Sequence, residues 1–198
     1  MKLLLLHGWG FDASIWDAMR AALAPIETLA WDQGYFGARH HARVAAPFIA
    51  VGHSLGSLLL AADPPAGCVG IIAINGFDRF AGEGLVATRL LDRMRARFAD
   101  APRAVLDDFR LRAGSGAHAG TIRADRLAAD LDRLATMDAR DGMTPRLVLH
   151  GGGDPILPAA MCEQVFAGAP RLTLAEAGHL LPVTHPGWCA ARIREVLR

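Results

Sequence analysis

The chain has 198 residues, a length that suits one globular domain and leaves no room for a second catalytic domain. Hydrophobic residues make up 52% of it, which is enough for a sizeable core and too much for a disordered chain. The 21 Lys and Arg residues nearly balance the 20 Asp and Glu residues, and a net charge of +1 argues against a nucleic-acid-binding protein.

Nothing near the start of the chain indicates secretion or a membrane span. The opening apolar run stops after Leu6, well short of the roughly 18–20 residues of a membrane helix and of the roughly 7–15 apolar residues of a signal peptide. The three cysteines (Cys68, Cys162 and Cys189) are odd in number and lack C-x-x-C spacing, which favours reduced thiols. We therefore expect a cytoplasmic protein that does not contact membranes.

Short apolar runs separated by turn residues predict six strands. The first run is apolar almost throughout, as expected of a strand that is buried on both faces of a parallel sheet. In chain order the predicted strands are Lys2–Leu6, Ile26–Trp31, Phe48–Val51, Val69–Ile74, Arg146–His150 and Arg171–Leu174.

Helical segments are predicted between most of these strands. They are Ser14–Leu23 with Ser14 as the N-cap, Ala38–Ala46, Ser54–Ala62, Ala159–Phe166 and Trp188–Leu197. Alternation of strands and helices is typical of a doubly wound α/β fold, with a mostly parallel sheet and helices on both faces.

Between about residues 78 and 143 this alternation stops, and three amphipathic helical stretches follow one another. Their apolar sets are Val86, Leu90, Met94 and Phe98, then Val105, Leu106 and Phe109, then Leu127, Leu131 and Leu134. We interpret this block as a helical cap inserted into a single domain that spans residues 1–198.

Gly52-His53-Ser54-Leu55-Gly56 is the strongest chemical signal in the chain. It matches G-x-S-x-G and lies directly after a predicted strand and before a predicted helix, the setting in which the motif forms a sharp turn that exposes the serine hydroxyl. Backbone N–H groups at the start of that helix can stabilise an anion. Ser54 is therefore the candidate nucleophile.

A serine nucleophile needs a base that is oriented by an acid, and hydrolases of this kind supply them in the order Ser, Asp or Glu, His. Asp154 follows the fifth predicted strand and His179 follows the sixth, so both lie at the sheet edge where sites of open α/β sheets form. Asp78, after the fourth strand, is an alternative acid, and His185 is an alternative base.

Acyl transfer also needs donors for the developing oxyanion. The backbone N–H of Leu55, directly after the candidate nucleophile, is one expected donor. The loop after the first strand, His7-Gly8-Trp9-Gly10, offers the N–H of Trp9 as the second. No metal or organic cofactor is expected.

Taken together, these segments resemble the α/β-hydrolase superfamily over nearly the whole chain. The opening His7-Gly8-Trp9-Gly10-Phe11-Asp12, followed by Trp16, resembles the pimeloyl-[acyl-carrier protein] methyl ester esterases of biotin synthesis. The resemblance implies the triad Ser54, Asp154 and His179, with Trp9 in the oxyanion hole. The chain departs from that pattern in the short segment between Asp32 and Ser54.

The same resemblance implies a cap whose arginines meet an acidic acyl-carrier protein, and five arginines are the candidates (Arg89, Arg93, Arg97, Arg103 and Arg110). We expect a monomeric serine carboxylesterase that hydrolyses an acyl methyl ester to the free acid and methanol. The alternatives are a thioesterase or small-ester hydrolase, a lyase of the menaquinone type on the same fold, and a non-catalytic binding protein.

Overall fold

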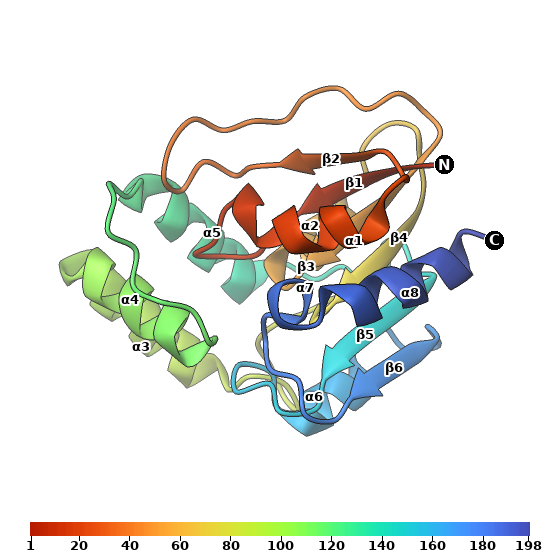
Figure 1. Cartoon of the computed structure of the whole chain (residues 1–198). Coiled ribbons are helices and arrows are strands. Elements are labelled where there is room, and N and C mark those ends of the chain that lie inside the picture. The colour runs from red at the N-terminus through yellow and green to blue at the C-terminus, as the bar shows by residue number, and fades with distance from the viewer.

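The computed structural model describes all 198 residues and contains one parallel sheet of six strands (Figure 1). The strand order is β2-β1-β3-β4-β5-β6, and every neighbouring pair is parallel. The strands are β1 (Lys2–Leu6), β2 (Thr28–Trp31), β3 (Phe48–His53), β4 (Cys68–Ile74), β5 (Leu147–Gly151) and β6 (Arg171–Leu174). The predicted fold class is confirmed.

Side chains of the central strands alternate between two buried clusters, one on each face of the sheet. On β1, Leu3 and Leu5 belong to one cluster, whereas Leu4 and Leu6 belong to the other. This alternation follows from the two-residue repeat of a strand, and both sets are apolar because helices cover both faces.

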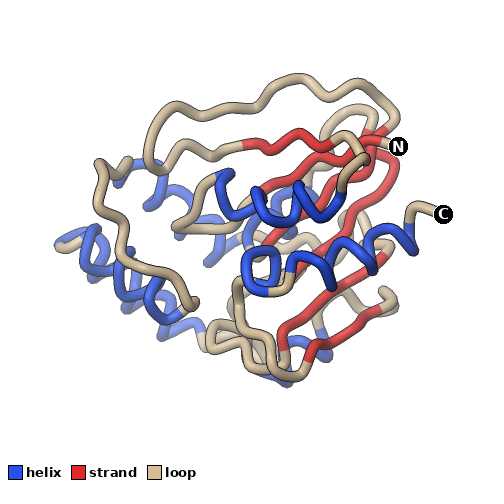
Figure 2. The backbone as a smooth tube through the Cα atoms, viewed as in Figure 1, coloured by secondary structure: helices blue, strands red, loops and turns tan.

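The covering helices divide between these faces (Figures 1 and 2). The short 3-10 helix η1 (Ala13–Trp16), α1 (Asp17–Leu23), α7 (Leu181–Thr184) and α8 (Pro186–Val196) cover the Leu3 and Leu5 face. α2 (Leu55–Ala62) and α6 (Ala159–Gln164) cover the other. No helix is both long and apolar enough to cross a lipid bilayer.

Three helices form the cap between β4 and β5: α3 (Thr88–Asp100), α4 (Pro102–Arg112) and α5 (Ala124–Thr136). α3 packs against both α4 and α5. Their buried residues, among them Leu91, Leu106 and Leu131, join the cluster on the α2 face. The cap is therefore continuous with the main core.

The helix predicted over Ala38–Ala46 does not form. The connection from β2 to β3 is instead an extended loop in which Asp32 and His40 exchange backbone hydrogen bonds of 2.8 and 2.9 Å. The Trp31 indole donates to Ala42 O at 2.7 Å and stacks on the His41 ring. The segment lacks a buried apolar stripe, which is the main source of stability for a short helix, so these contacts determine its path.

Two local predictions are also wrong. Asp12, rather than Ser14, caps the first helical turn by accepting from Ser14 N at 2.9 Å. In α3 the buried residues are Leu91 and Phe98, while Leu90 is 52% exposed. A four-residue repeat drifts around a helix of 3.6 residues per turn, so a stripe over Leu91, Met94 and Phe98 replaces the predicted one. Other element ends differ from the predictions by one or two residues.

Candidate active site

Ser54 occupies a strained turn between two regular elements. β3 ends at His53 and α2 begins at Leu55, and Ser54 between them has φ 51° and ψ −123°. A positive φ is costly for a residue with a side chain and persists only where the surroundings impose it. Gly52 and Gly56 permit the turn, because a Cβ at either position would collide with neighbouring backbone. The side chain of Ser54 is consequently presented at the end of the sheet.

His179 and Asp154 form a buried hydrogen-bonded pair. His179 Nδ1 lies 2.7 Å from Asp154 Oδ2, and both side chains are at most 1% exposed. Asp154 Oδ1 accepts from the backbone N–H groups of Ile156 and Leu157 at 2.7 and 3.1 Å. Burial alone would raise the pKa of Asp154, but His179 and these two N–H groups outweigh it and hold the pKa below its ordinary value. The carboxylate therefore stays charged.

Asn75, which the sequence reasoning missed, joins the loops that carry this pair. Its Nδ2 donates to Asp154 Oδ2 at 2.8 Å and to Gly178 O at 2.9 Å, and its Oδ1 accepts from Gly151 N at 3.1 Å. Asn75 has φ 44° and is fully buried. The available signal was a polar residue directly after an apolar strand. Through these three bonds, Asn75 joins the loop that carries Asp154 to the loop that carries His179.

His53, the last residue of β3, contacts the loop that carries His179. Its Nε2 lies 2.9 Å from His179 O, and burial lowers its pKa to about 3. The ring is therefore neutral, and because a carbonyl only accepts, Nε2 carries the proton. His53, Asn75, Asp154 and His179 thus come from the carboxyl ends of the adjacent strands β3, β4, β5 and β6.

The alternative acid and base lie elsewhere. Asp78 is buried and its Oδ2 accepts from Phe166 N at 2.7 Å, while Ala139 N donates to its carbonyl oxygen. It therefore joins the start of the cap to the segments near β5 and β6. His185 is the N-cap of α8, and its ring contacts the Thr184 hydroxyl.

The loop after β1 passes directly over Ser54. A Cβ at Gly8 would lie 2.8 Å from Ser54 Cβ, so only glycine allows this approach. The Trp9 side chain is 1% exposed, donates through Nε1 to Leu127 O of α5 at 2.8 Å, and meets Phe98 and Phe109 edge to face. Trp9 thus anchors the cap through its side chain while its backbone belongs to the loop over Ser54.

The cap closes over the site. Phe109 of α4 lies edge-on to the His179 ring at 6.4 Å, Ser54 is only 6% exposed, and His179 is fully buried. His179 Nε2 has no hydrogen-bond partner, so no bond to Ser54 is formed in this state. Such bonds are often long before substrate binds.

A cleft of about 490 Å³ lies between the cap and the loop after β5. Its apolar lining includes Trp9, Met94, Phe109, Ile156 and Leu157, and Asp154 borders it. This size and character are typical of sites that bury a small ligand.

The five cap arginines do not form one surface. Arg103 donates to the carbonyl oxygens of His118 and Gly120, and Arg110 donates to those of Gly10 and Gly116. Both guanidinium groups therefore brace the loop after α4. Arg89, Arg93 and Arg97 are exposed on α3.

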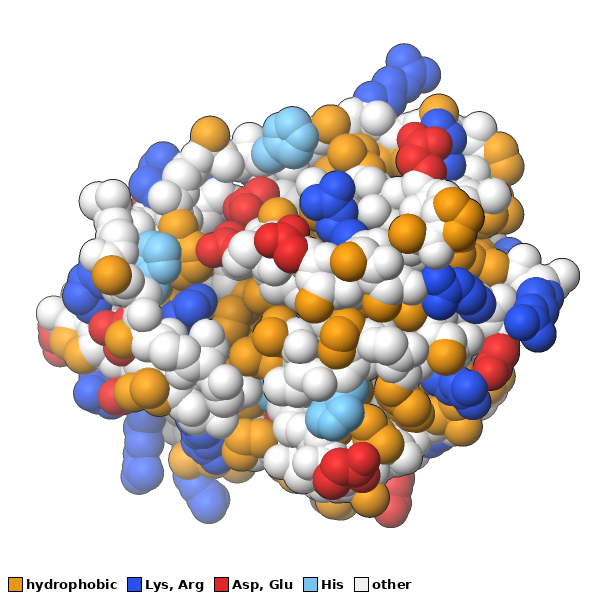
Figure 3. Space-filling model, in the orientation of Figure 1, with side chains coloured by type: hydrophobic (Ala, Val, Ile, Leu, Met, Phe, Trp, Pro, Cys, Tyr) orange, Lys and Arg blue, Asp and Glu red, His pale blue; other side chains and the backbone are white.

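Of these three α3 arginines, only Arg97 has a carboxylate partner, Asp108 at 2.7 Å. Figure 3 shows basic side chains gathered over α3 and α4, at the lower left. Arg93 and Arg97 also line the cleft.

A parallel sheet with a serine turn after one strand, and an acid and a histidine after later strands, is the arrangement of an α/β hydrolase. The chain belongs to the alpha/beta hydrolase family, whose profile matches residues 3–192. A pimeloyl-[acyl-carrier protein] methyl ester esterase of Photobacterium profundum is 25% identical over 231 residues, covering 93% of this chain and 89% of that protein. A protein of the same name from Aromatoleum aromaticum is 36% identical over 75 residues, covering 36% of this chain and 29% of that protein.

Solved structures share the fold at lower identity. A thermophilic esterase from Thermogutta terrifontis has a TM-score of 0.75 at 20% identity, covering 100% of this chain and 89% of that chain. The esterase EaEST from Exiguobacterium antarcticum has a TM-score of 0.78 at 14% identity, covering 100% and 92%.

Buried neutral histidines beside the site predict a loss of stability in mild acid. Burial lowers the pKa of His53 to about 3 and that of His150 to about 4, whereas an unfolded histidine has a pKa of about 6.5. Below pH 6.5 the unfolded chain therefore binds protons that the folded chain does not. The free energy of unfolding should fall by up to about 1.4 kcal/mol per pH unit for each of the two histidines.

Urea unfolding between pH 7.5 and pH 4.5 measures this loss. In His150→Leu, the free energy of unfolding should fall less steeply as the pH is lowered. His40→Gln, at an exposed position, should not change this dependence on pH. An unchanged slope in His150→Leu would contradict the prediction.

Proposed function

We propose that this protein is a serine carboxylesterase in which Ser54 is the nucleophile, His179 the general base and Asp154 the residue that orients the base. The observation that carries the proposal is the buried Asp154–His179 hydrogen bond at the same sheet edge as the strained Ser54 turn. The esterase names of the curated relatives support ester hydrolysis.

In the proposed reaction, His179 Nε2 accepts the proton of Ser54 as its Oγ attacks the ester carbonyl. Asp154 holds the Nδ1–H of His179, which leaves Nε2 as the basic nitrogen, and it stabilises the imidazolium that forms. His179 then gives the proton to the departing alkoxide, the alcohol leaves, and water releases the acid from the acyl-enzyme by the same route.

The N–H groups of Trp9 and Leu55 are the proposed oxyanion donors. Two contacts support this assignment: Gly8 packs on Ser54, which brings the loop of Trp9 over the nucleophile, and Leu55 begins α2. Donors fixed in a water-excluded site stabilise developing charge without reorganising, which is the largest catalytic contribution in many enzymes.

The proposed substrate is the methyl ester of an acyl chain carried on acyl-carrier protein, in biotin synthesis. The names of both curated relatives support it, the apolar cleft suits an acyl chain, and Arg93 and Arg97 line that cleft, with Arg89 exposed on the same helix. Restored growth without biotin in a bacterial strain that lacks its own esterase of this kind would support this role, and continued biotin dependence despite soluble expression would oppose it.

A small free ester is the second candidate substrate. The internal bonds of Arg103 and Arg110 and the ion pair of Arg97 leave only Arg89 and Arg93 without a partner among the five cap arginines. A thioesterase is tested by the same assays with a thioester. A burst of nitrophenol from an activated ester would exclude a non-catalytic binding protein.

Loss of either Ser54 or His179 should abolish turnover. We expect Ser54→Ala and His179→Ala each to lower kcat on nitrophenyl acetate by about 10⁴–10⁶-fold, and the double variant to lose little more, because the two side chains act as a unit. Steady-state kinetics measures this. Near-normal activity in either single variant would exclude the serine mechanism.

The acid is tested separately. Asp154→Asn should cost orders of magnitude in kcat, because it removes the negative charge. The N–H groups of Ile156 and Leu157 would also hold the amide oxygen, so an NH2 group rather than an acceptor would face His179 Nδ1. Asp78→Asn is the matched control, since Asp78 contacts neither His179 nor Ser54, and it should keep kcat within about tenfold. The reverse order of effects would assign the acid to Asp78.

Asn75 is proposed as a positioning residue. Asn75→Ala removes the bonds to Asp154, Gly178 and Gly151, and small displacements of a catalytic group cost about 10²-fold, so kcat should fall by about 10–100-fold. KM should change by less than about threefold, because Asn75 is not among the residues that line the cleft. Thermal unfolding identifies a variant that fails to fold, and an unchanged kcat in a folded variant would contradict this role.

If Arg89 and Arg93 contact the acyl-carrier protein, reversing their charge should affect a carrier-linked substrate but not a small free ester. Arg89→Glu with Arg93→Glu should lower kcat/KM on a carrier-linked ester by about tenfold at low salt, because association with an acidic partner slows. Hydrolysis of nitrophenyl acetate should stay within about twofold. Raising salt should lower the wild-type rate on the carrier substrate, since charges are screened over about 10 Å at 0.1 M.

Arg20→Glu with Arg198→Glu is the matched control, because it changes the net charge equally at exposed positions away from the cap. It should leave the carrier rate within about twofold. Equal rates for wild type and the Arg89/Arg93 variant would favour a small free ester.

A further inference from the structure

A hollow lies where a crossover helix would normally cover the sheet. Parallel strands are usually joined by a helix, but residues 32–47 between β2 and β3 form only a loop, visible along the top of Figure 2. Two cavities, of about 340 and 780 Å³, open beside this loop, and both are bordered by Trp31 and Pro65.

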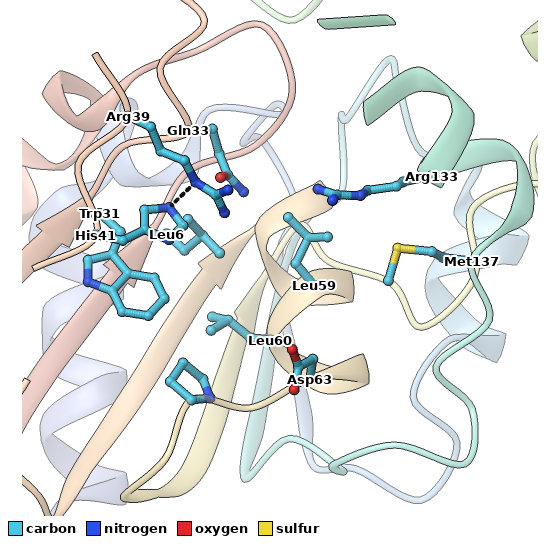
Figure 4. A pocket seen from close by; sticks show the side chains of 11 residues that line it. Leu6, Trp31, Gln33, Arg39, His41, Leu59, Leu60, Asp63, Arg133 and Met137 are labelled. Carbon is cyan, nitrogen blue, oxygen red and sulfur yellow. Dashed lines mark hydrogen bonds between the residues drawn. The ribbon is translucent and has the colours of Figure 1, made fainter. Parts of the chain in front are cut away.

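The 340 Å³ cavity, here called the side pocket, has an apolar floor and one flat wall (Figure 4). The wall is the stack of Trp31 on His41, with ring centroids 4.3 Å apart and an angle of 10° between planes. The apolar residues are Leu6, Leu59, Leu60, Pro65 and Met137. The volume is at the lower end of the roughly 300–1,000 Å³ that ligand sites occupy.

Three polar side chains supply hydrogen-bond donors to the side pocket. In Figure 4, Arg39 and Gln33 enter from one side and Arg133 from the other. Arg39 uses only Nε, toward His41 Nε2 at 3.3 Å, and Arg133 uses only Nη1, toward Asp130 at 2.8 Å. Gln33 is 5% exposed, yet its side-chain amide makes no hydrogen bond within the protein.

The charges in and around the side pocket favour one negative group near the arginines. Burial, together with the adjacent Arg39, lowers the pKa of His41 to about 4, so this ring is neutral and accepts from Arg39. Asp130 already neutralises Arg133 in part, and Asp63 lies at the other end of the pocket. A second negative group at that end would meet Asp63.

We propose that the side pocket is a second binding site, separate from the candidate active site, for a small organic monocarboxylate with an apolar body. The carboxylate lies between Arg39 and Arg133 and accepts from the Gln33 amide, because guanidinium groups match carboxylates in geometry and charge. The apolar body covers Leu59 and Leu60 and lies against Trp31. Asp63 selects against a second carboxylate.

Such a ligand contacts both the hydrolase core and the cap, since Arg133 and the adjacent Met137 belong to α5 and its C-cap. The side pocket is also linked through Gln33 to the loop over Ser54. Gln33 N donates to His7 Nε2 at 3.0 Å, and His7 Nδ1 bonds to Gly8 O at 2.9 Å.

The test is a titration of the ¹⁵N-labelled full chain with hexanoate, followed by the indole N–H signals of its four tryptophans. The Trp31 signal, whose N–H is bonded to Ala42 O, should shift and saturate. Hexanamide, which lacks the charge, and adipate, which has a second carboxylate, should each bind at least about tenfold more weakly. Shifts confined to Trp9 of the cleft, or no saturable shift of Trp31, would overturn the proposal.

Variants distinguish binding in the side pocket from nonspecific electrostatic attraction of the carboxylate to the protein. Arg39→Ala should weaken hexanoate binding by about tenfold, and Gln33→Leu and Arg133→Lys, which retain size or charge, should weaken it several-fold. Arg43→Ala is the matched control, because it removes the same charge from the same loop outside the side pocket. Equal weakening in Arg43→Ala and Arg39→Ala, or adipate binding as tight as that of hexanoate, would overturn the proposed site.

Discussion

The hydrogen bond between Asp154 and His179 joins two loops that are 25 residues apart in the chain, and the candidate active site depends on it. Its geometry is a consequence of the sheet. Because β3, β4, β5 and β6 are adjacent and parallel, their carboxyl ends bring Ser54, Asn75, Asp154 and His179 to one edge. Asn75 and His179 bond to the same oxygen of Asp154, Oδ2, while backbone N–H groups hold the other oxygen.

Burial strengthens the charge interactions in this arrangement, but it also disfavours a charged or unpaired polar group. A charged Asp154 and a neutral His53 are held in a region where His179 is fully buried, and charge interactions there are stronger than in water. Backbone N–H groups and the Asn75 amide supply the bonds that keep such a carboxylate stable. The two unpartnered nitrogens of His150 have no such compensation.

The cap and the candidate site are mechanically connected through Trp9. Its indole is bonded to α5, its ring packs against Phe98 of α3 and Phe109 of α4, and its backbone lies in the loop over Ser54. Phe109 in turn lies against His179. Any movement of the cap that opens the cleft must therefore change contacts made by Trp9.

The sequence was sufficient to predict those parts of the fold that depend on local apolar patterns. Six strands, the Ser54 turn and the positions of Asp154 and His179 at strand ends followed from runs such as Lys2–Leu6 and from G-x-S-x-G. Asn75 could not be assigned a role, because its three partners lie 76 to 103 residues away and no spacing rule connects them. The internal bonds of Arg103 and Arg110 were not predicted for a different reason: a solvated helix face and a hydrogen-bonded one have the same sequence pattern.

The absence of a helix over residues 38–46, where one was predicted, has the largest structural consequence. Where a crossover helix would have covered Leu6 and Leu59 with its own apolar side chains, the loop leaves a hollow with the side chains of Arg39 and Gln33 at its rim. A helix needs an apolar stripe to pack there, and this segment has mainly alanine, arginine and histidine. Most arginines of the cap and loops have carboxylate or carbonyl partners. Arg39 and Arg133 instead keep unused donors at this hollow, which favours an anion as its ligand.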